Sequence, residues 1–168
     1  MADVNVLVAF YSRYGKTEQM ALAAGLGAIQ AKANIRLRRI ADLADTKTIR
    51  ADAEWTANLD RMNGDYVVPR PADPTWADVI VLATPADSSI EIERYVQFLG
   101  SIDSLAGKIA APLISGEGHS TLDQIYALAA RAGLIVVPPP TAEGDVVAKA
   151  RAHGRRLAGM ARALKERG

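Results

Sequence analysis

Short apolar runs that alternate with helical patterns constrain the fold of this 168-residue chain more than any other feature. Residues 4–10, 78–84 and 109–115 are almost continuously apolar and are each followed by a polar loop, which is typical of parallel strands covered on both faces. Residues 134–137 form another apolar run, and residues 34–40 alternate apolar side chains with arginines, as edge strands do. This alternation of strands and helices predicts an α/β fold with a doubly wound, five-stranded parallel sheet.

Helical patterns follow most of the predicted strands. One begins near Thr17, two more fit residues 91–99 and 121–131, and the last occupies residues 145–168 with a basic outer face. Gly133 is expected to end the helix over 121–131. Pro112 is the one residue that conflicts with its predicted strand, because proline has no N–H to donate to the sheet.

Residues 41–77 are longer than a strand–helix–strand connection needs. Trp55, Leu59 and Met62 are spaced as on one face of a short amphipathic helix. The stretches 63–65 and 69–74 have the composition of loops, being rich in Asn, Gly, Asp and Pro. We therefore expect one domain, 1–168, with 41–77 as an elaborated connection between the second and third strands.

Composition excludes several classes of function. The chain has no cysteine and two histidines, so disulfides, iron–sulfur clusters and a cysteine nucleophile are excluded, and we expect no metal site. Its net charge of +1 argues against nucleic acid as a main partner. Because no apolar run is long enough to span a bilayer and no signal peptide is recognisable, we expect a cytoplasmic protein without a membrane span.

The loop after the first predicted strand has the residue types of a phosphate site. Ligands of open parallel sheets bind at the carboxyl ends of the strands, which places three loops together: 11–17, 85–90 and 116–121. The first loop combines hydroxyls, a glycine and a helix N-terminus, the groups that bind a phosphate; its residues are Ser12, Arg13, Tyr14, Gly15, Lys16 and Thr17. The alternative is an ordinary strand–helix turn in which Thr17 caps the helix.

Other nucleotide motifs fit this loop less well. Residues 15–17 match the end of a nucleoside-triphosphate P-loop, but Phe10 stands where that motif requires its first glycine. Gly25 and Gly27 lie inside a predicted helix and do not form a dinucleotide fingerprint. A hydroxyl-rich phosphate loop in a doubly wound sheet instead favours flavin mononucleotide (FMN), with its ring across the loops after the third and fourth strands.

Several segments together resemble the flavodoxin-like NAD(P)H:quinone oxidoreductases of the Trp-repressor-binding-protein (WrbA) type. The most specific is Tyr11-Ser12-Arg13-Tyr14-Gly15-Lys16-Thr17-Glu18-Gln19-Met20-Ala21, and supporting segments are 61–69, 77–85, 133–139 and 154–157. The resemblance implies a flavodoxin-like three-layer sandwich with a five-stranded parallel sheet. It also implies an FMN enzyme, a homodimer or homotetramer, that passes two electrons from NADH or NADPH to a quinone or a similar small planar acceptor.

The resemblance weakens on the side where the flavin ring is expected. After the third strand, 86–90 has neither the aromatic residue nor the glycine of the family pattern, and the family's tryptophan-containing segment before the fourth strand is missing. The loop after the fourth strand is contracted, and the family histidine before the fifth strand is absent. The cofactor-binding residues expected on this side are Thr84, Pro85, Ala86, Asp87, Ser88, Ser115, Gly116, Glu117, Gly118 and His119.

Three functions remain open from the sequence. The leading one is an FMN-dependent NAD(P)H:quinone oxidoreductase, in which no side chain need act as a catalytic group. The second is a flavodoxin-fold binding protein that has lost or weakened FMN binding, which the altered ring-side loops favour. A one-electron flavodoxin shuttle is disfavoured by the charge of +1, because such carriers are typically acidic. His119 could contact a flavin or quinone, or could be a solvated or capping residue.

Overall fold

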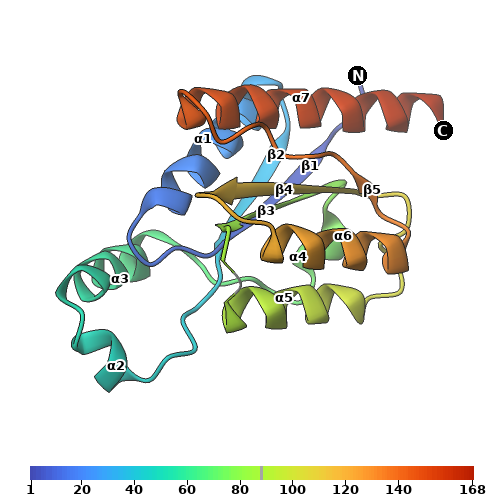
Figure 1. Ribbon diagram of the computed structural model, residues 1–168. Coiled ribbons are helices and arrows are strands. Elements are labelled where there is room, and N and C mark those ends of the chain that lie inside the picture. The colour runs from blue at the N-terminus through green and yellow to red at the C-terminus, as the bar shows by residue number, and fades with distance from the viewer. Residues whose placement is uncertain (88) are drawn as a thin grey trace.

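A computed structural model describes residues 1–87 and 89–168 of the chain. Five parallel strands form one sheet in the order β2-β1-β3-β4-β5 (Figure 1). They are β1 (Asn5–Phe10), β2 (Asn34–Arg39), β3 (Val79–Pro85), β4 (Ile109–Ser115) and β5 (Ile135–Val136). The prediction of a doubly wound, five-stranded parallel sheet is confirmed, with β2 at an edge.

The three central strands owe their place to apolar side chains on both faces. In β1, for example, Val6 and Val8 pack on one side of the sheet, whereas Leu7 and Ala9 pack on the other. All four side chains are at most 1% exposed. Burying both faces favours the middle of an α/β sheet, whereas β2, with its three arginines, is mostly half-buried.

Four long helices cover the two faces. Helices α1 (Lys16–Gln30) and α7 (Val146–Arg167) lie on one face, and α5 (Ile90–Gly100) and α6 (Ser120–Ala132) lie on the other (Figure 1). Two glycines let α1 and α7 approach closely: a Cβ atom on Gly154 would come within 2.0 Å of the Ala24 carbonyl oxygen, and one on Gly27 within 1.9 Å of the Arg151 oxygen. Gly133 ends α6 with φ +70°, as predicted.

Pro112 lies where no neighbouring strand is placed to accept a hydrogen bond from its backbone nitrogen. The N–H that proline lacks is therefore not needed there. The carbonyls of Lys108, just before β4, and of Ala110, within it, accept from the N–H groups of Ile135 and Val137 on the β5 side. Because backbone groups of alternate residues in a parallel strand point to the same side, Pro112 also faces β5. However, β5 ends at Val136 and is followed by prolines, so the conflict seen in the sequence disappears.

The connection between β2 and β3 contains more helix than the sequence pattern indicates. The predicted amphipathic helix is α3 (Ala53–Asp65), and α2 (Thr46–Arg50) and α4 (Asp73–Trp76) accompany it. The loop prediction for 63–65 is wrong, because these residues form the last turn of α3. Likewise, Asp73 and Pro74 begin α4; buried Asp73 accepts hydrogen bonds from Arg36 and Arg38 of β2 and so holds this turn against the sheet.

The described residues contain neither a membrane-spanning helix nor a cluster of metal-binding side chains. No helix within them is long and apolar enough to cross a membrane. They also contain no group of three or more histidine, aspartate or glutamate side chains that could hold a metal ion.

Candidate functional site

A cavity of about 340 Å³ opens at the carboxyl ends of β1, β3 and β4. This is the edge of the sheet where the strand order reverses, since β2 follows β1 on one side and β3 lies on the other. Ligands of doubly wound folds bind at such a point. The residues that line the cavity are Tyr11, Ser12, Arg13, Tyr14, Thr17, Pro85, Asp87, Ser89 and Ser115.

The loop between β1 and α1 forms one end of this cavity, which we call the phosphate loop (residues 12–17). Gly15 adopts φ +93°, a conformation that side chains disfavour, and its N–H donates to the Ser12 hydroxyl at 3.1 Å. Within the described chain no side chain caps the N-terminus of α1. The amides of its first turn and the positive end of its dipole are therefore available to an anion. The alternative of a helix capped by Thr17 is wrong.

Thr17 instead joins the phosphate loop to β4. Its hydroxyl lies 2.6 Å from that of Ser115, and the two side chains are buried. This bond links residues that are 98 positions apart in the sequence and fixes both hydroxyls at the cavity wall. A hydroxyl has one hydrogen to donate, so whichever of the two accepts in this pair keeps its hydrogen and can donate it to a ligand oxygen.

Arg13 and Tyr14 turn toward the α3 segment. The Arg13 guanidinium lies 4.3 Å from the centre of the Trp55 ring, and its Nε donates to the Tyr11 hydroxyl at 2.8 Å. The hydrogen bond to Tyr11 raises the pKa of Arg13. The Tyr14 hydroxyl donates to Asp52 at 2.7 Å, while half of the Tyr14 side chain stays exposed. The apolar part of Tyr14 is thus left to form the cavity rim.

On the β3 side, the backbone is held by the N-terminus of α6. The Ala86 carbonyl accepts from the Thr121 hydroxyl at 3.1 Å and from the Ser120 hydroxyl at 3.3 Å, and the Ala86 N–H donates to the Ser115 carbonyl. Thr84 is fully buried and its hydroxyl donates to the Pro85 carbonyl. Pro85 and exposed Asp87 line the cavity, whereas Ser88 lies outside the described residues.

The remaining predicted residues do not line this cavity. Lys16, Gly116 and Glu117, together with Ser115, line a smaller neighbouring cavity of about 180 Å³ beside α7. Gly118 adopts φ +133° and packs near Ala86, with a Cβ position 3.5 Å from that residue's Cβ. His119 is exposed and precedes α6 without capping it through its side chain. Of the predicted residues, the structure thus brings together at this cavity Ser12, Arg13, Tyr14, Thr17, Pro85, Asp87 and Ser115.

Sequence reasoning missed the buried polar network behind the cavity. The Tyr11 hydroxyl lies 3.1 Å from an Asp42 oxygen and 3.2 Å from a Glu91 oxygen, and Asp42 also accepts from the Trp55 indole at 3.0 Å. Burial raises the pKa of Tyr11. Tyr11 and Ser89 themselves line the cavity but were not among the predicted site residues. Only the position of Tyr11 directly after the first strand could have indicated it.

Two curated proteins of similar sequence are named as quinone dehydrogenases. No protein-family model matches the chain. A curated NAD(P)H dehydrogenase (quinone) of Deinococcus radiodurans is 29% identical over 150 residues, covering 82% of this chain and 74% of that protein. NAD(P)H dehydrogenase (quinone) 3 of Rhizobium meliloti is 25% identical over 146 residues, covering 80% of this chain and 66% of the relative.

Solved structures share the fold at lower identity. A flavodoxin from the domain Archaea superposes with a TM-score of 0.65 at 14% identity, covering 95% of this chain and 99% of its own. The two-electron reduced flavodoxin of Megasphaera elsdenii gives 0.62 at 19% identity, with coverages of 92% and 98%. A flavone reductase gives 0.63 at 16% identity, with coverages of 96% and 64%. The predicted flavodoxin-like α/β fold is confirmed.

Proposed function

We propose that this protein is an FMN-dependent NAD(P)H:quinone oxidoreductase. The observation that carries the proposal is the phosphate loop at the switch point of the sheet, with the buried hydroxyls of Ser12, Thr17 and Ser115 at one cavity wall. Flavodoxin-like folds bind FMN at this position. The names of the two curated relatives add the nicotinamide donor and the quinone acceptor.

The residues present fit the phosphate end of FMN. Gly15 in its left-handed conformation and the uncapped start of α1 form a cradle of the kind that binds phosphate through backbone N–H groups. The hydroxyls of Ser12 and Thr17 would complete that contact. Tyr14 from one side and Pro85 and Asp87 from the other would flank the ring, because they line the same cavity.

Bound FMN would supply the redox chemistry, accepting a hydride from NADH or NADPH and passing both electrons to a quinone. The chain itself contributes binding and access. The cavity opens to solvent, and at its β3 side the Ala86 carbonyl is held by the hydroxyl of Thr121 of α6. We infer that donor and acceptor therefore use the same open face in turn, with the acceptor a quinone or a similar planar molecule.

Stopped-flow mixing of FMN-loaded protein with NADH or NADPH tests the proposal. The flavin absorbance should bleach with at least one donor and should return when a quinone is added, and steady-state rates should follow ping-pong kinetics. A flavin that binds but stays oxidised with both donors would contradict the reductase.

A second candidate is a binding protein of the same fold in which FMN binding is weakened or lost. The observation that favours it is the engagement of the α6 N-terminus by Ala86, which leaves that helix end without a ligand role. In that case, no flavin should co-purify and added FMN should bind no better than inorganic phosphate.

Among reductases, the motif at 11–21 favours the WrbA type, and a homodimer or homotetramer is the assembly that we propose.

A further inference from the structure

Arg39, the last residue of β2, is a buried cation that contacts the phosphate loop. Its Nη2 atom donates to Asp42 Oδ2 at 2.5 Å and to the Ser12 carbonyl at 3.4 Å. The side chains of Arg39 and Asp42 are 5% and 3% exposed. Ser12 lines the cavity at the carboxyl ends of the strands, whereas Arg39 does not. Burying a charge is costly unless it is paired, and this pair is placed against the backbone of the loop.

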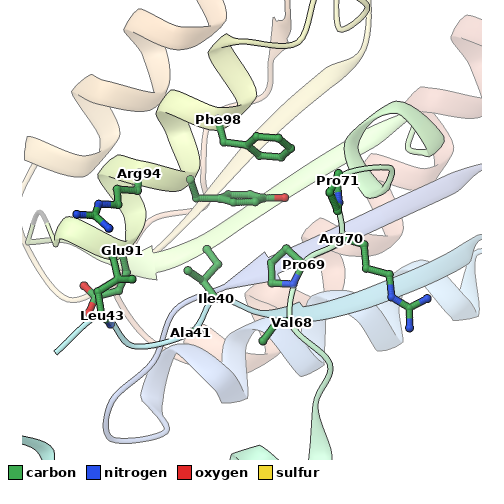
Figure 2. A pocket seen from close by; sticks show the side chains of 11 residues that line it. Ile40, Ala41, Leu43, Val68, Pro69, Arg70, Pro71, Glu91, Arg94 and Phe98 are labelled. Carbon is green, nitrogen blue, oxygen red and sulfur yellow. Dashed lines mark hydrogen bonds between the residues drawn. The ribbon is translucent and has the colours of Figure 1, made fainter. Parts of the chain in front are cut away.

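Asp42 is held in place by groups from other segments of the chain. Its Oδ1 atom accepts from the Trp55 indole at 3.0 Å and lies 3.1 Å from the Tyr11 hydroxyl. The next residue, Leu43, donates its N–H to Glu91 of α5 at 3.1 Å. Figure 2 shows Leu43 and Glu91 together in the wall of a second cavity, of about 390 Å³. The carboxylate that pairs with β2 therefore has a fixed position.

The bond from Arg39 fixes the direction of the peptide group between Ser12 and Arg13. The described chain has no cis peptide, and in a trans peptide the carbonyl and the N–H point in opposite directions. The Ser12 carbonyl points toward Arg39, so the Arg13 N–H points away from it. No described residue accepts a hydrogen bond from this N–H. The Ser12 hydroxyl is fixed as well, because it accepts from the Gly15 N–H at 3.1 Å.

We propose, on the basis of the proposed function, that Arg39 is a positioning residue for the FMN phosphate. It acts through Ser12 and does not touch the cofactor. By holding the Ser12 carbonyl it leaves the Arg13 N–H to donate to a phosphate oxygen, as backbone amides of such loops do. The loop then has its binding conformation before FMN arrives, which raises affinity because little ordering is needed on binding.

The preceding residue of β2 provides a matched control for a purely structural role. Arg38 pairs with Asp73 at 2.9 Å, and their side chains are 14% and 0% exposed. This pair holds α4 against the sheet, and neither of its residues lines the cavity. Loss of either buried pair should destabilise the protein. Of the two pairs, the one formed by Arg39 contacts the phosphate loop.

Fluorescence titration of the purified full-length protein with FMN and with riboflavin, which lacks the phosphate, tests the proposal. Arg39→Met/Asp42→Asn removes both charges, so no buried carboxylate is left unpaired. Its FMN affinity should fall about fivefold or more, whereas its riboflavin affinity should change less than about twofold. Arg38→Met/Asp73→Asn should keep both affinities. Unchanged FMN affinity in the folded Arg39 variant, or an equal loss for FMN and riboflavin, would overturn the proposal.

Inorganic phosphate separates this proposal from the reductase function. In amide NMR spectra of isotope-labelled protein, phosphate should shift the Arg13 signal of the wild type and shift it far less in the Arg39 variant. This readout needs no bound or reduced flavin, so it decides the role of Arg39 even if the protein is not a reductase. An Arg13 amide that does not respond to saturating phosphate in the wild type would refute the assignment.

A second variant covers the case in which Arg39→Met/Asp42→Asn does not fold. Arg39→Lys keeps a positive charge beside Asp42 but has a shorter side chain without the guanidinium fork, so it should lose the bond to the Ser12 carbonyl. It should show the same selective loss of FMN affinity. Full FMN affinity and a normal phosphate response in Arg39→Lys would contradict the positioning role.

Discussion

The cavity at the carboxyl ends of β1, β3 and β4 has a helix N-terminus on each side, and the two N-termini have different partners. At the phosphate loop, α1 begins without a side-chain cap from any described residue, and Ser12 and Thr17 line the cavity beside it. At the β3 side, the N-terminus of α6 is occupied, because its Thr121 N–H and hydroxyl bond the Ala86 carbonyl. One helix N-terminus is left for a ligand, whereas the other stabilises the protein's own loop. We therefore expect the specificity for FMN to come mainly from contacts with its phosphate group.

The largest expected effect concerns the packing of α7 against α1, the helix that follows the phosphate loop. Gly154→Ala should destabilise the protein by about 3 kcal/mol, because the new methyl group meets the Ala24 backbone at 2.0 Å and must push α7 away from α1. Gly159→Ala lies in the same helix with no atom within 4 Å of the added Cβ, and should stabilise by about 0.5–1 kcal/mol. Chemical denaturation of both variants gives the difference, and equal stabilities would refute the close packing.

The next effect lies in the phosphate loop itself. Gly15→Ala forces a side chain into φ +93° and brings its Cβ within 3.3 Å of an Asn58 oxygen, so about 1 kcal/mol of stability and at least tenfold of FMN affinity should be lost. Gly144→Ala carries a similar backbone penalty at φ +76° outside the cavity. It should cost comparable stability and leave FMN affinity unchanged. If both variants bind FMN equally, the loop conformation does not matter for binding.

A smaller expected effect is a pH dependence of the protein's stability, which arises from Glu18 close to the phosphate loop. Glu18, in the first turn of α1, is buried and accepts two hydrogen bonds from Arg61, at 2.8 and 2.6 Å, and a third from Tyr66. The bonds from Arg61 lower the pKa of Glu18 below its ordinary value of 4.5. The stabilisation is therefore fully present above about pH 4.5 and is lost as the pH falls through the lowered folded-state value.

Glu18→Gln should accordingly lower stability at pH 7 by about 1–2 kcal/mol and flatten the acid limb of the profile. Thermal melts between pH 7 and pH 3 provide the measurement. Asp60→Asn, which breaks an exposed pair with Arg50, is the control and should shift the profile little. An unchanged acid limb in Glu18→Gln would mean that Glu18 does not link α1 to α3.

The sequence predicted the sheet far better than the cavity wall. Continuous apolar runs identify strands because the burial of both faces is a local property of the run, and residues 109–115 match β4 at both ends. The helix α2 was missed although Asp45 caps it through the Thr48 N–H. The short helix α4 at Asp73 was missed because the side chains that stabilise it, Arg36 and Arg38, lie far away in the sequence, on β2.

The same limit applies to the candidate site. Residues 12–17 could be proposed as a phosphate site because their hydroxyls, glycine and helix start are consecutive in the sequence. The bond between Thr17 and Ser115 joins distant positions, and the network of Tyr11, Asp42 and Glu91 depends on the packing of three separate segments. Polar residues that pair across the fold leave no periodic pattern, so their roles had to come from the structure.

The most direct test of the account compares FMN with riboflavin, which lacks the phosphate, in a fluorescence titration of the purified protein. If the phosphate loop provides the main contact, FMN should bind at least thirtyfold more tightly than riboflavin, a difference of about 2 kcal/mol. Thr17→Val, which removes a cradle hydroxyl, should lose most of that preference, whereas Asp87→Asn on the β3 side should keep it. Equal binding of FMN and riboflavin would contradict the account, because the phosphate loop would then hold nothing.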